Sequence, residues 1–342
     1  MWRRVIFLGT CVALIAASSM RMTVSHAYES APAPSRSFEF TYIVHVPALS
    51  AGSGNMGIWI PLPQTDSHQR VSALRVASPV HYRITREAKS GNEFAYLNFS
   101  AARGHAPFDI RLTFEARREE YKVTLPASDT TAQASFPPSV ARFLLPDRLV
   151  PIDGMIGELS KEQTAGIGDP LQKARKIYEY VIAHMHYDHA GTGWGHGDAI
   201  FACTMHHGNC TDFHSLFIGM ARAAGIPARF EIGFAIPPAE SAGKIAGYHC
   251  WAEFYLQGVG WVPIDASEAW QDPARHDFYF GGLDADRVRF ASGRDLTLTP
   301  PQAGGPVNYV VYPYAELNGK PYSGLAQEFS FHYLQTAATA GQ

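Results

Sequence analysis

The first third of the chain alternates apolar and polar residues with a period of two. Phe38, Phe40, Tyr42, Val44 and Val46 are separated by mostly polar neighbours, which is typical of a strand with one buried face. The pattern continues, between clusters of glycine, proline, asparagine and serine, over residues 58–60, 80–84, 94–99 and 108–114. We therefore expect an antiparallel β-sandwich over residues 38–130. No titratable cluster stands out there, so its expected role is structural or docking.

A helical period replaces this alternation further along the chain. Asp169 and Pro170 form a helix-start signal, an N-cap followed by proline at the first helical position. Apolar residues then recur on one helical face up to Met185. After a loop rich in glycine and histidine, a second helix is expected to begin at Cys210 and to close at Gly225.

Period two returns after this second helix, which defines the class of the fold. Three strands are expected over residues 229–235, 248–256 and 261–266. Helices followed by antiparallel strands favour an α+β domain, which we place at residues 135–300. A C-terminal extension and tail follow over residues 301–342.

The first residues carry a different signal. Arg3 and Arg4 precede an apolar run over residues 5–17, and Ser25-His26-Ala27 resembles a signal-peptidase site. We expect a signal peptide over residues 1–27 and a linker over 28–37, with an uncleaved N-terminal anchor as the alternative. The mature protein would then be periplasmic or secreted, without a membrane span.

Composition and charge exclude some partners. The 342 residues are 46% hydrophobic and 17% charged, with a formal net charge of −3, which is ordinary for globular proteins. Such a charge gives no field that would attract nucleic acid. We therefore expect no nucleic-acid partner.

The cysteines point to a reactive thiol. Removal of a signal peptide takes Cys11 away and leaves Cys203, Cys210 and Cys250. An odd number in an exported protein suggests one unpaired thiol. A disulfide between Cys203 and Cys250 is one candidate pairing, and it would leave Cys210 free.

A thiol at a helix N-terminus gains nucleophilicity when a base and an orienting carboxylate lie nearby. His249 and Asp265 lie on consecutive expected strands. If Leu256 pairs with Gly260 across a three-residue loop, His249 and Asp265 share one face of the sheet as diagonal neighbours. We expect this odd loop to use glycine in a left-handed conformation.

Three ordered motifs resemble the core of the transglutaminase-like superfamily, which shares a papain-like thiol triad. They are Gly208-Asn209-Cys210 at the start of a helix that ends in RAAGIPAR, the segment YHCWAE around His249, and GWVPID ending at Asp265. The resemblance spans about residues 165–270. It implies Cys210 as nucleophile, His249 as general base and acid, and Asp265 as orienting carboxylate. Cys250 departs from the small residue usual after the histidine.

The reaction implied is acyl transfer from an amide to water or to an amine. The backbone N–H of Cys210 and the indole of Trp194 are candidate donors to the oxyanion, with packing as the alternative role for the indole. Asn209 and His214 are further candidates for the lining of the cleft, with packing beneath it as the alternative for His214. The expected substrate is a peptide or protein, with the cell envelope as one source. A non-catalytic docking protein that keeps the fold is the alternative function.

We expect no cofactor and no metal. The histidine-rich region lacks the tight spacing of strong zinc sites, and no acidic loop of the calcium-binding type is present. The calcium requirement of animal transglutaminases is therefore not carried over. The side chains that would form a rival zinc site are Cys203, His184, His186, His189, His196, His206, His207 and His214.

Overall fold

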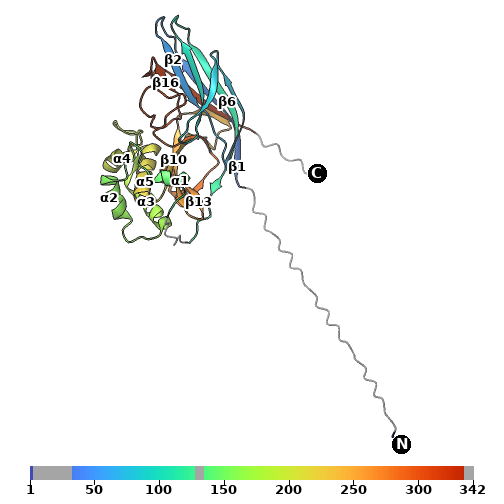
Figure 1. The fold of residues 1–342 in the computed structure, drawn as a ribbon, viewed down its shortest axis with the longest axis vertical. Helices are drawn as coiled ribbons and strands as arrows, with labels where there is room; N and C mark the ends of the chain where they lie inside the picture. The colour runs from blue at the N-terminus through green and yellow to red at the C-terminus, as the bar shows by residue number, and fades with distance from the viewer. Residues whose placement is uncertain (3–32, 128–134, 335–342) are drawn as a thin grey trace. The chain divides into compact units, whose positions relative to one another are not determined.

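The computed structural model describes residues 1–2, 33–127 and 135–334. Most of the expected signal peptide, 1–27, lies outside these residues. Residues Ala33–Gln342 form one compact unit. Within it, two five-stranded sheets lie at one end and the helices at the other, with the strand β10 between them (Figure 1).

The first five-stranded sheet is antiparallel and has the order β11-β18-β1-β6-β3. Its central strand, β1, buries Phe38, Phe40, Tyr42, Val44 and Val46, so the alternation read from the sequence corresponds to a buried face. The strands are β1 (Ser35–Val46), β3 (Gln69–Ala77), β6 (Phe108–Glu119), β11 (Ala242–Ile245) and β18 (Ala326–Tyr333).

The second five-stranded sheet has the order β17-β16-β2-β5-β4 and is also antiparallel. Its strands are β2 (Asn55–Pro61), β4 (Tyr82–Arg86), β5 (Glu93–Ser100), β16 (Tyr314–Leu317) and β17 (Lys320–Pro321). Phe99 of β5 and Phe108 of β6 lie 5.7 Å apart between ring centroids, which brings the two sheets into contact.

Both sheets include strands from the C-terminal part of the chain, and this corrects the expected division. The boundaries 38–130 and 135–300 do not separate independent units, because β18 pairs with β1 along its length and β16 pairs with β2. Strands β16 to β18 fall in the region expected to be an extension and tail. Periodicity along the sequence cannot reveal such pairing, since each strand shows only its own alternation.

The α+β part contains a four-stranded antiparallel sheet with the order β13-β12-β10-β15. Its strands are β10 (Ala228–Ala235), β12 (His249–Leu256), β13 (Gly260–Ile264) and β15 (Arg287–Ser292). One face packs on helix α5, where the rings of Phe217 and Phe254 lie 6.1 Å apart. The helices are α2 (Gly154–Gln163), α3 (Pro170–His184), α4 (Ala199–Met205), α5 (Cys210–Ala223) and α6 (Ala266–Gln271).

The two helices expected from the sequence are confirmed as α3 and α5. Asp169 caps α3, its side chain accepting from the backbone N–H of Leu171 and Gln172, while α2, α4 and α6 were not predicted. The remaining elements are short: α1 (Pro138–Ala141), η1 (Arg142–Leu144), η2 (Pro273–Arg275), β7 (Tyr121–Lys122), β8 (His186–Tyr187), β9 (His207–Gly208) and β14 (Gly282–Leu283). Among the helices of the described residues, none is long and apolar enough to cross a membrane.

The hairpin between β12 and β13 has the register expected from the sequence. Leu256 pairs with Gly260 and Ala252 with Ile264, so the loop contains three residues. Gly258 and Gly260 have φ of +80° and +102°, a region that favours glycine because it has no Cβ. The predicted odd loop with left-handed glycine is confirmed.

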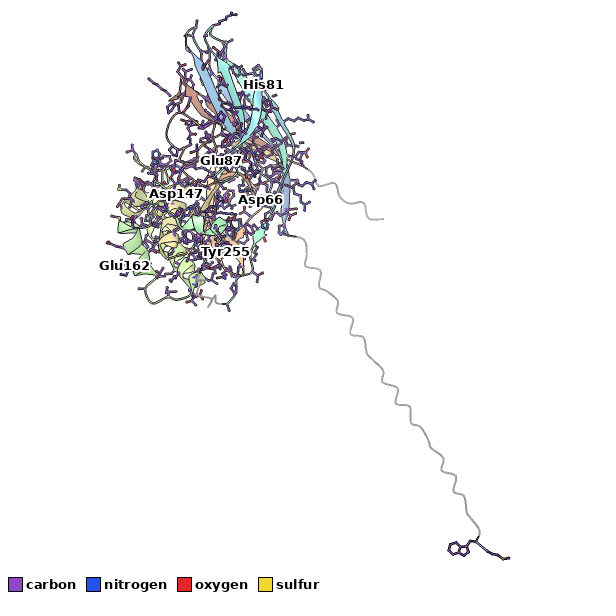
Figure 2. All side chains as sticks on the ribbon, viewed as in Figure 1. Asp66, His81, Glu87, Asp147, Glu162 and Tyr255 are labelled. Carbon is purple, nitrogen blue, oxygen red and sulfur yellow. The ribbon has the colours of Figure 1, made fainter. Side chains whose placement is uncertain are left out.

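The four-stranded sheet also contacts the strands of the first third of the chain. Asp66 and Glu87, both labelled in Figure 2, lie in this region. Asp66 accepts from Arg289 Nε of β15 at 2.9 Å, and Glu87 holds Asn92, which bonds the carbonyl of Ser292 at 2.9 Å. These polar contacts fix the sheet that bears His249 against the five-stranded sheets.

Candidate active site

The sequence before Cys210 determines how α5 begins. Asn209 is the N-cap, and its side-chain oxygen accepts from the backbone N–H of Thr211 at 3.0 Å. In the reciprocal hydrogen bond, the side chain of Asp212 accepts from the backbone N–H of Asn209 at 3.0 Å. This capping box places Cys210 in the first turn, where free N–H groups and the helix dipole favour a thiolate.

Asp212 also holds the loop that precedes the helix. Its two carboxylate oxygens accept from the backbone N–H of Gly195 at 2.7 Å and of Gly197 at 3.0 Å. Gly208 has φ of +149°, and a Cβ there would lie 2.3 Å from Asp212 Oδ2. The sequence analysis missed Asp212, although an Asn three residues before an Asp is a recognisable capping signal.

His249 and Asp265 meet at the ends of neighbouring strands. His249 Nε2 lies 2.7 Å from Asp265 Oδ2, and Asp265 is fully buried. The other oxygen, Oδ1, accepts from Ser267 Oγ and from the backbone N–H of Glu268, both at 3.0 Å. Asp265 therefore orients the imidazole while it also caps α6.

Arg287 of β15 completes the surroundings of this carboxylate. Its Nη1 donates to Asp265 Oδ2 at 2.9 Å, and its side chain is 3% exposed. Nothing in the sequence pattern points to Arg287, because it lies on a strand that was not predicted. Sequence reasoning therefore missed a charged residue in direct contact with the expected triad.

The pKa values of the three groups respond to one another. Burial would raise the pKa of the Cys210 thiol, but hydrogen bonds with Cys250 and His249 and the charge of His249 lower it to about 6. Burial opposes the charged form of His249, yet Asp265 and Cys210 raise its pKa well above the usual value. Burial likewise opposes the charged form of Asp265, but His249 and Arg287 hold its pKa far below the usual range. The arrangement favours a thiolate–imidazolium pair near neutral pH.

His214 lies under the site and not in a cleft. It is fully buried one turn after Cys210. Its Nδ1 donates to the carbonyl of Cys210 at 2.7 Å, and its Nε2 accepts from the backbone N–H of Ala266 at 3.1 Å. The contact with Ala266 needs a neutral ring, because a charged imidazole has no nitrogen free to accept, and burial lowers the pKa of His214 to about 4. His214 thus ties helix α5 to the turn that carries Asp265.

Trp194 does not occupy the position expected of an oxyanion donor. Its indole N–H donates to the carbonyl of Gly191 at 3.2 Å, and its ring stacks on His189 with centroids 4.4 Å apart. Local bonding within the loop satisfies the indole. The amide of Asn209 is also engaged, since Nδ2 donates to the hydroxyl of Tyr248 at 2.8 Å.

The cysteine pairing expected as one possibility is not formed. Cys203, Cys210 and Cys250 are all free thiols. Cys203 is partly exposed on α4, whereas Cys250 is buried on β12, with Sγ 3.6 Å from His214 Nδ1. The strand directs Cys250 toward α5, where His214 lies one turn after Cys210.

The thiol is almost covered in this state. Cys210 is 1% exposed and His249 6%. Gly195 packs above the helix start, where its carbonyl accepts from the hydroxyl of Tyr309 at 2.6 Å, and Tyr248 reaches the same carbonyl at 3.4 Å. Access to the thiol therefore requires neighbouring residues to move.

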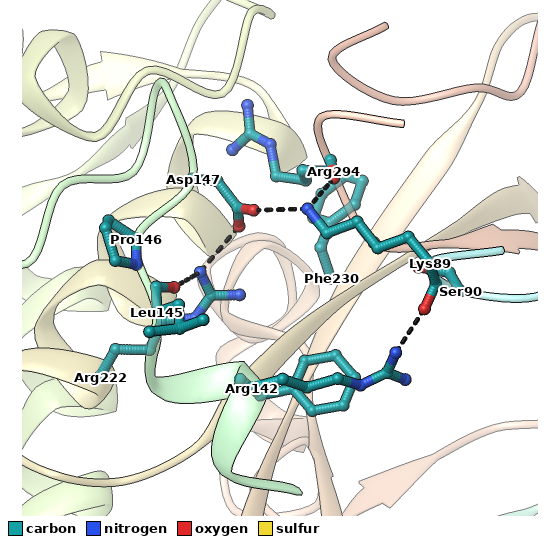
Figure 3. A pocket seen from close by; sticks show the side chains of 11 residues that line it. Lys89, Ser90, Arg142, Leu145, Pro146, Asp147, Arg222, Phe230 and Arg294 are labelled. Atoms are coloured by element: carbon teal, nitrogen blue, oxygen red, sulfur yellow. Dashed lines mark hydrogen bonds and ion pairs between the residues drawn. The ribbon is translucent and has the colours of Figure 1, made fainter. Parts of the chain in front are cut away.

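A basic cavity of about 200 Å³ lies elsewhere along α5 (Figure 3). Asp147 accepts there from Arg222 at 2.7 Å and from Lys89 at 3.3 Å. Arg294 donates to the carbonyl of Gly197 and to Ser215 Oγ, so it braces the loop before the nucleophile. The cavity does not include the thiol or its partners. Across the described residues, no group of three or more His, Cys, Asp or Glu is arranged to hold a metal ion.

Comparison with known proteins agrees with this architecture. Residues 157–266 match the family model of the transglutaminase-like superfamily. An uncharacterised protein of Haemophilus influenzae is 28% identical over 348 residues, which cover 91% of this chain and 92% of that protein. The uncharacterised protein YebA of Bacillus subtilis is 31% identical over 77 residues, or 20% of this chain and 10% of YebA.

A solved structure shares the fold over most of the chain. The crystal structure of a candidate cysteine protease from Cytophaga hutchinsonii superposes with a TM-score of 0.59 and 18% identity, covering 89% of this chain and 93% of that one. The fold is thus of the mixed α and β class with antiparallel sheets. Within this fold, residues 157–266 are the part that matches the transglutaminase-like superfamily.

Proposed function

We propose that this protein is an exported, thiol-dependent acyl-transfer enzyme that acts on amide bonds of peptides or proteins. The observation that carries the proposal is the 2.7 Å hydrogen bond between His249 Nε2 and Asp265 Oδ2, together with a thiol at the start of α5 whose pKa is lowered to about 6. A helix-borne thiolate, a base and an orienting carboxylate are the three groups that covalent acyl transfer needs.

In the proposed mechanism, the Cys210 thiolate attacks the carbonyl carbon of the amide. Asp265 engages Nε2 of His249, which leaves Nδ1 to face the thiol and then to protonate the leaving amine. Water or a second amine, deprotonated by the same nitrogen, releases the acyl group from the sulfur. The backbone N–H of Cys210 is the proposed donor to the oxyanion, because the indole of Trp194 is bonded to Gly191.

Because the Cys210 thiol is covered, a substrate must displace neighbouring residues before it reaches the thiol. A substrate that displaces Gly195 breaks its contacts with Tyr309 and Asp212, at 2.6 and 2.7 Å. The covering loop contains glycine at 191, 193, 195 and 197, all with positive φ, so a hinge is available there. We propose that peptide binding opens this loop. The export part of the proposal depends on the sequence of residues 1–27.

The test uses a glutamine-containing peptide with and without a primary amine, followed by mass spectrometry. Deamidation, cleavage or incorporation of the amine would each support acyl transfer and would identify the acceptor. Cys210→Ala should abolish the change, by at least about 1,000-fold. Cys203→Ala is the matched control, because it removes a partly exposed thiol on α4 and should retain activity.

Two results would contradict the proposal. The first is product formation that Cys210→Ala does not diminish. The second is no product from a broad peptide panel together with alkylation of Cys210 at the rate of an ordinary thiol. The second result would favour a docking protein that keeps the transglutaminase-like fold.

A further inference from the structure

Cys250 is a buried thiol that the proposed mechanism does not use. It follows His249 on β12, so its side chain points to the opposite face of the strand. Phe254, on the same face, packs against Phe217 of α5. Cys250 therefore faces α5, at the level of the first helical turn.

The partners of Cys250 bring it against the nucleophile. Its sulfur lies 3.6 Å from His214 Nδ1, and that nitrogen donates to the carbonyl of Cys210 at 2.7 Å. Burial raises the pKa of the Cys250 thiol, and the neighbouring Cys210 thiol raises it further. The two cysteines thus lie beside the same imidazole in the protein interior, with Cys250 0% and Cys210 1% exposed.

We propose that Cys250 is a resolving cysteine, which converts oxidised Cys210 into a reversible Cys210–Cys250 disulfide. The proposal deepens the proposed function, because it concerns the same thiolate. A disulfide requires two side chains that already approach each other, and Cys250 Sγ lies 3.6 Å from the imidazole nitrogen that bonds the carbonyl of Cys210. Cys203 lies on a different helix and takes no part.

The oxidant is hydrogen peroxide, and the reaction balances in two steps. The Cys210 thiolate attacks one oxygen, the O–O bond breaks, and the imidazolium of His249 protonates the leaving hydroxide to water. The sulfur of Cys250 then attacks the resulting sulfenic acid, so that the S–S bond forms and the S–O bond breaks. Its thiol proton leaves with hydroxide as a second water.

The consequence is protection of the nucleophile. A thiolate with a lowered pKa is readily oxidised, and a sulfenic acid without a nearby thiol proceeds to the sulfinic and sulfonic acids, which do not return. Formation of the disulfide keeps Cys210 at an oxidation state that a dithiol reductant can return to the thiol. A peroxide molecule is close to water in size, so it needs less opening of the covering loop than a peptide does.

The experiment follows mass instead of turnover, so it is separate from the test of acyl transfer. Wild type, Cys250→Ala and Cys203→Ala are treated with increasing hydrogen peroxide, unfolded in alkylating reagent, and analysed intact and after digestion. Wild type and Cys203→Ala should lose two hydrogen atoms, carry a Cys210–Cys250 crosslink, and recover both thiols with dithiothreitol. Cys250→Ala should gain two or three oxygen atoms on Cys210 and not recover.

If Cys250→Ala does not fold, Cys250→Ser replaces it in this experiment, because serine nearly keeps the volume of the side chain. The crosslink itself is measured in the wild-type protein and needs no variant. Sulfinic acid on Cys210 of the wild type at the rate of the Cys250 variants would overturn the proposal. A crosslink through Cys203, or no crosslink while Cys210 is consumed, would also overturn it. If the untreated wild-type protein shows no acyl transfer, that result would count against the proposed function and not against the disulfide.

Discussion

His249 Nε2 and Asp265 Oδ2 lie 2.7 Å apart although neither residue faces the other directly in the ladder between β12 and β13. The ladder pairs Ala252 with Ile264, and Asp265 follows the last paired residue of β13. The contact therefore depends on the diagonal approach of two side chains on one face of the sheet. It also depends on the odd loop that gives both residues the same face.

Asp265→Asn should keep the fold and lose most of the activity. An amide is isosteric, but it does not hold the imidazole in the same tautomer or stabilise its charged form, so kcat should fall about 100- to 10,000-fold. Initial rates with the most active peptide check this. Ser267→Ala is the control, because it removes only the Ser267 Oγ contact with the other oxygen of Asp265, at 3.0 Å. Equal losses in the two variants would contradict the assigned role.

Alkylation of Cys210 should follow a titration centred near pH 6. The lowered pKa of the thiol, about 6, means that the thiolate persists above this pH, whereas an ordinary cysteine titrates near about 8.5. The rate with iodoacetamide, measured from pH 4 to 10 in a Cys203→Ser background, tests this. His249→Gln should move the midpoint upward, because it removes the imidazolium. A wild-type midpoint at the ordinary value would contradict the thiolate–imidazolium pair.

His214 should make the protein less stable as the pH falls below about 6.5. Burial lowers the pKa of His214 to about 4 in the folded state, while the unfolded value is about 6.5. Between these values the unfolded state binds one more proton, so the free energy of unfolding decreases with falling pH, by up to about 3 kcal/mol. Urea unfolding from pH 4 to 8 should show a shallower pH dependence in His214→Gln than in wild type. His184→Gln, on the exposed surface of α3, is the control, and identical slopes in wild type and His214→Gln would contradict the assignment.

Arg287→Met should destabilise the fold strongly. The side chain is 3% exposed and lies 2.9 Å from Asp265 and 3.3 Å from Asp284, so its loss removes one cation from both carboxylates, of which Asp265 is fully buried. Such a change costs about 3–5 kcal/mol. Arg275→Met is a matched control, because Arg275 pairs with the same Asp284 at 3.1 Å but is 39% exposed, and its loss should cost about 1 kcal/mol or less. Equal unfolding midpoints would show that burial does not decide the effect.

The sequence predicted best those elements whose ends are marked by local residues, such as a helix cap or a short hairpin loop. Helices α3 and α5 begin at a cap, and the β12–β13 hairpin has a loop whose length settles the register. The contact of His249 with Asp265 followed from that register alone. The indole of Trp194 was predicted less well, because a flexible, glycine-rich loop allows it to bond the nearby carbonyl of Gly191.

Long-range contacts were beyond sequence reasoning. Arg287 reaches Asp265 from a strand 22 positions later, and no periodicity marks that approach. Cys250 follows His249 on β12, so its side chain points to the opposite face of the strand. The sequence did not indicate that the opposite face contains the nucleophile, because the depth at which α5 lies on the sheet is set by packing of side chains such as Phe217.

The pairing of β1 with β18 has a consequence for the timing of folding. Phe38 lies beside Tyr333, so one edge of β1 stays unpaired until β18 is in place. Closing so long a segment is entropically costly, and folds dominated by such distant pairs form slowly. A chain cut between Cys210 and β18 would therefore keep the thiol but leave β11 without its neighbouring strand and β1 with an open edge.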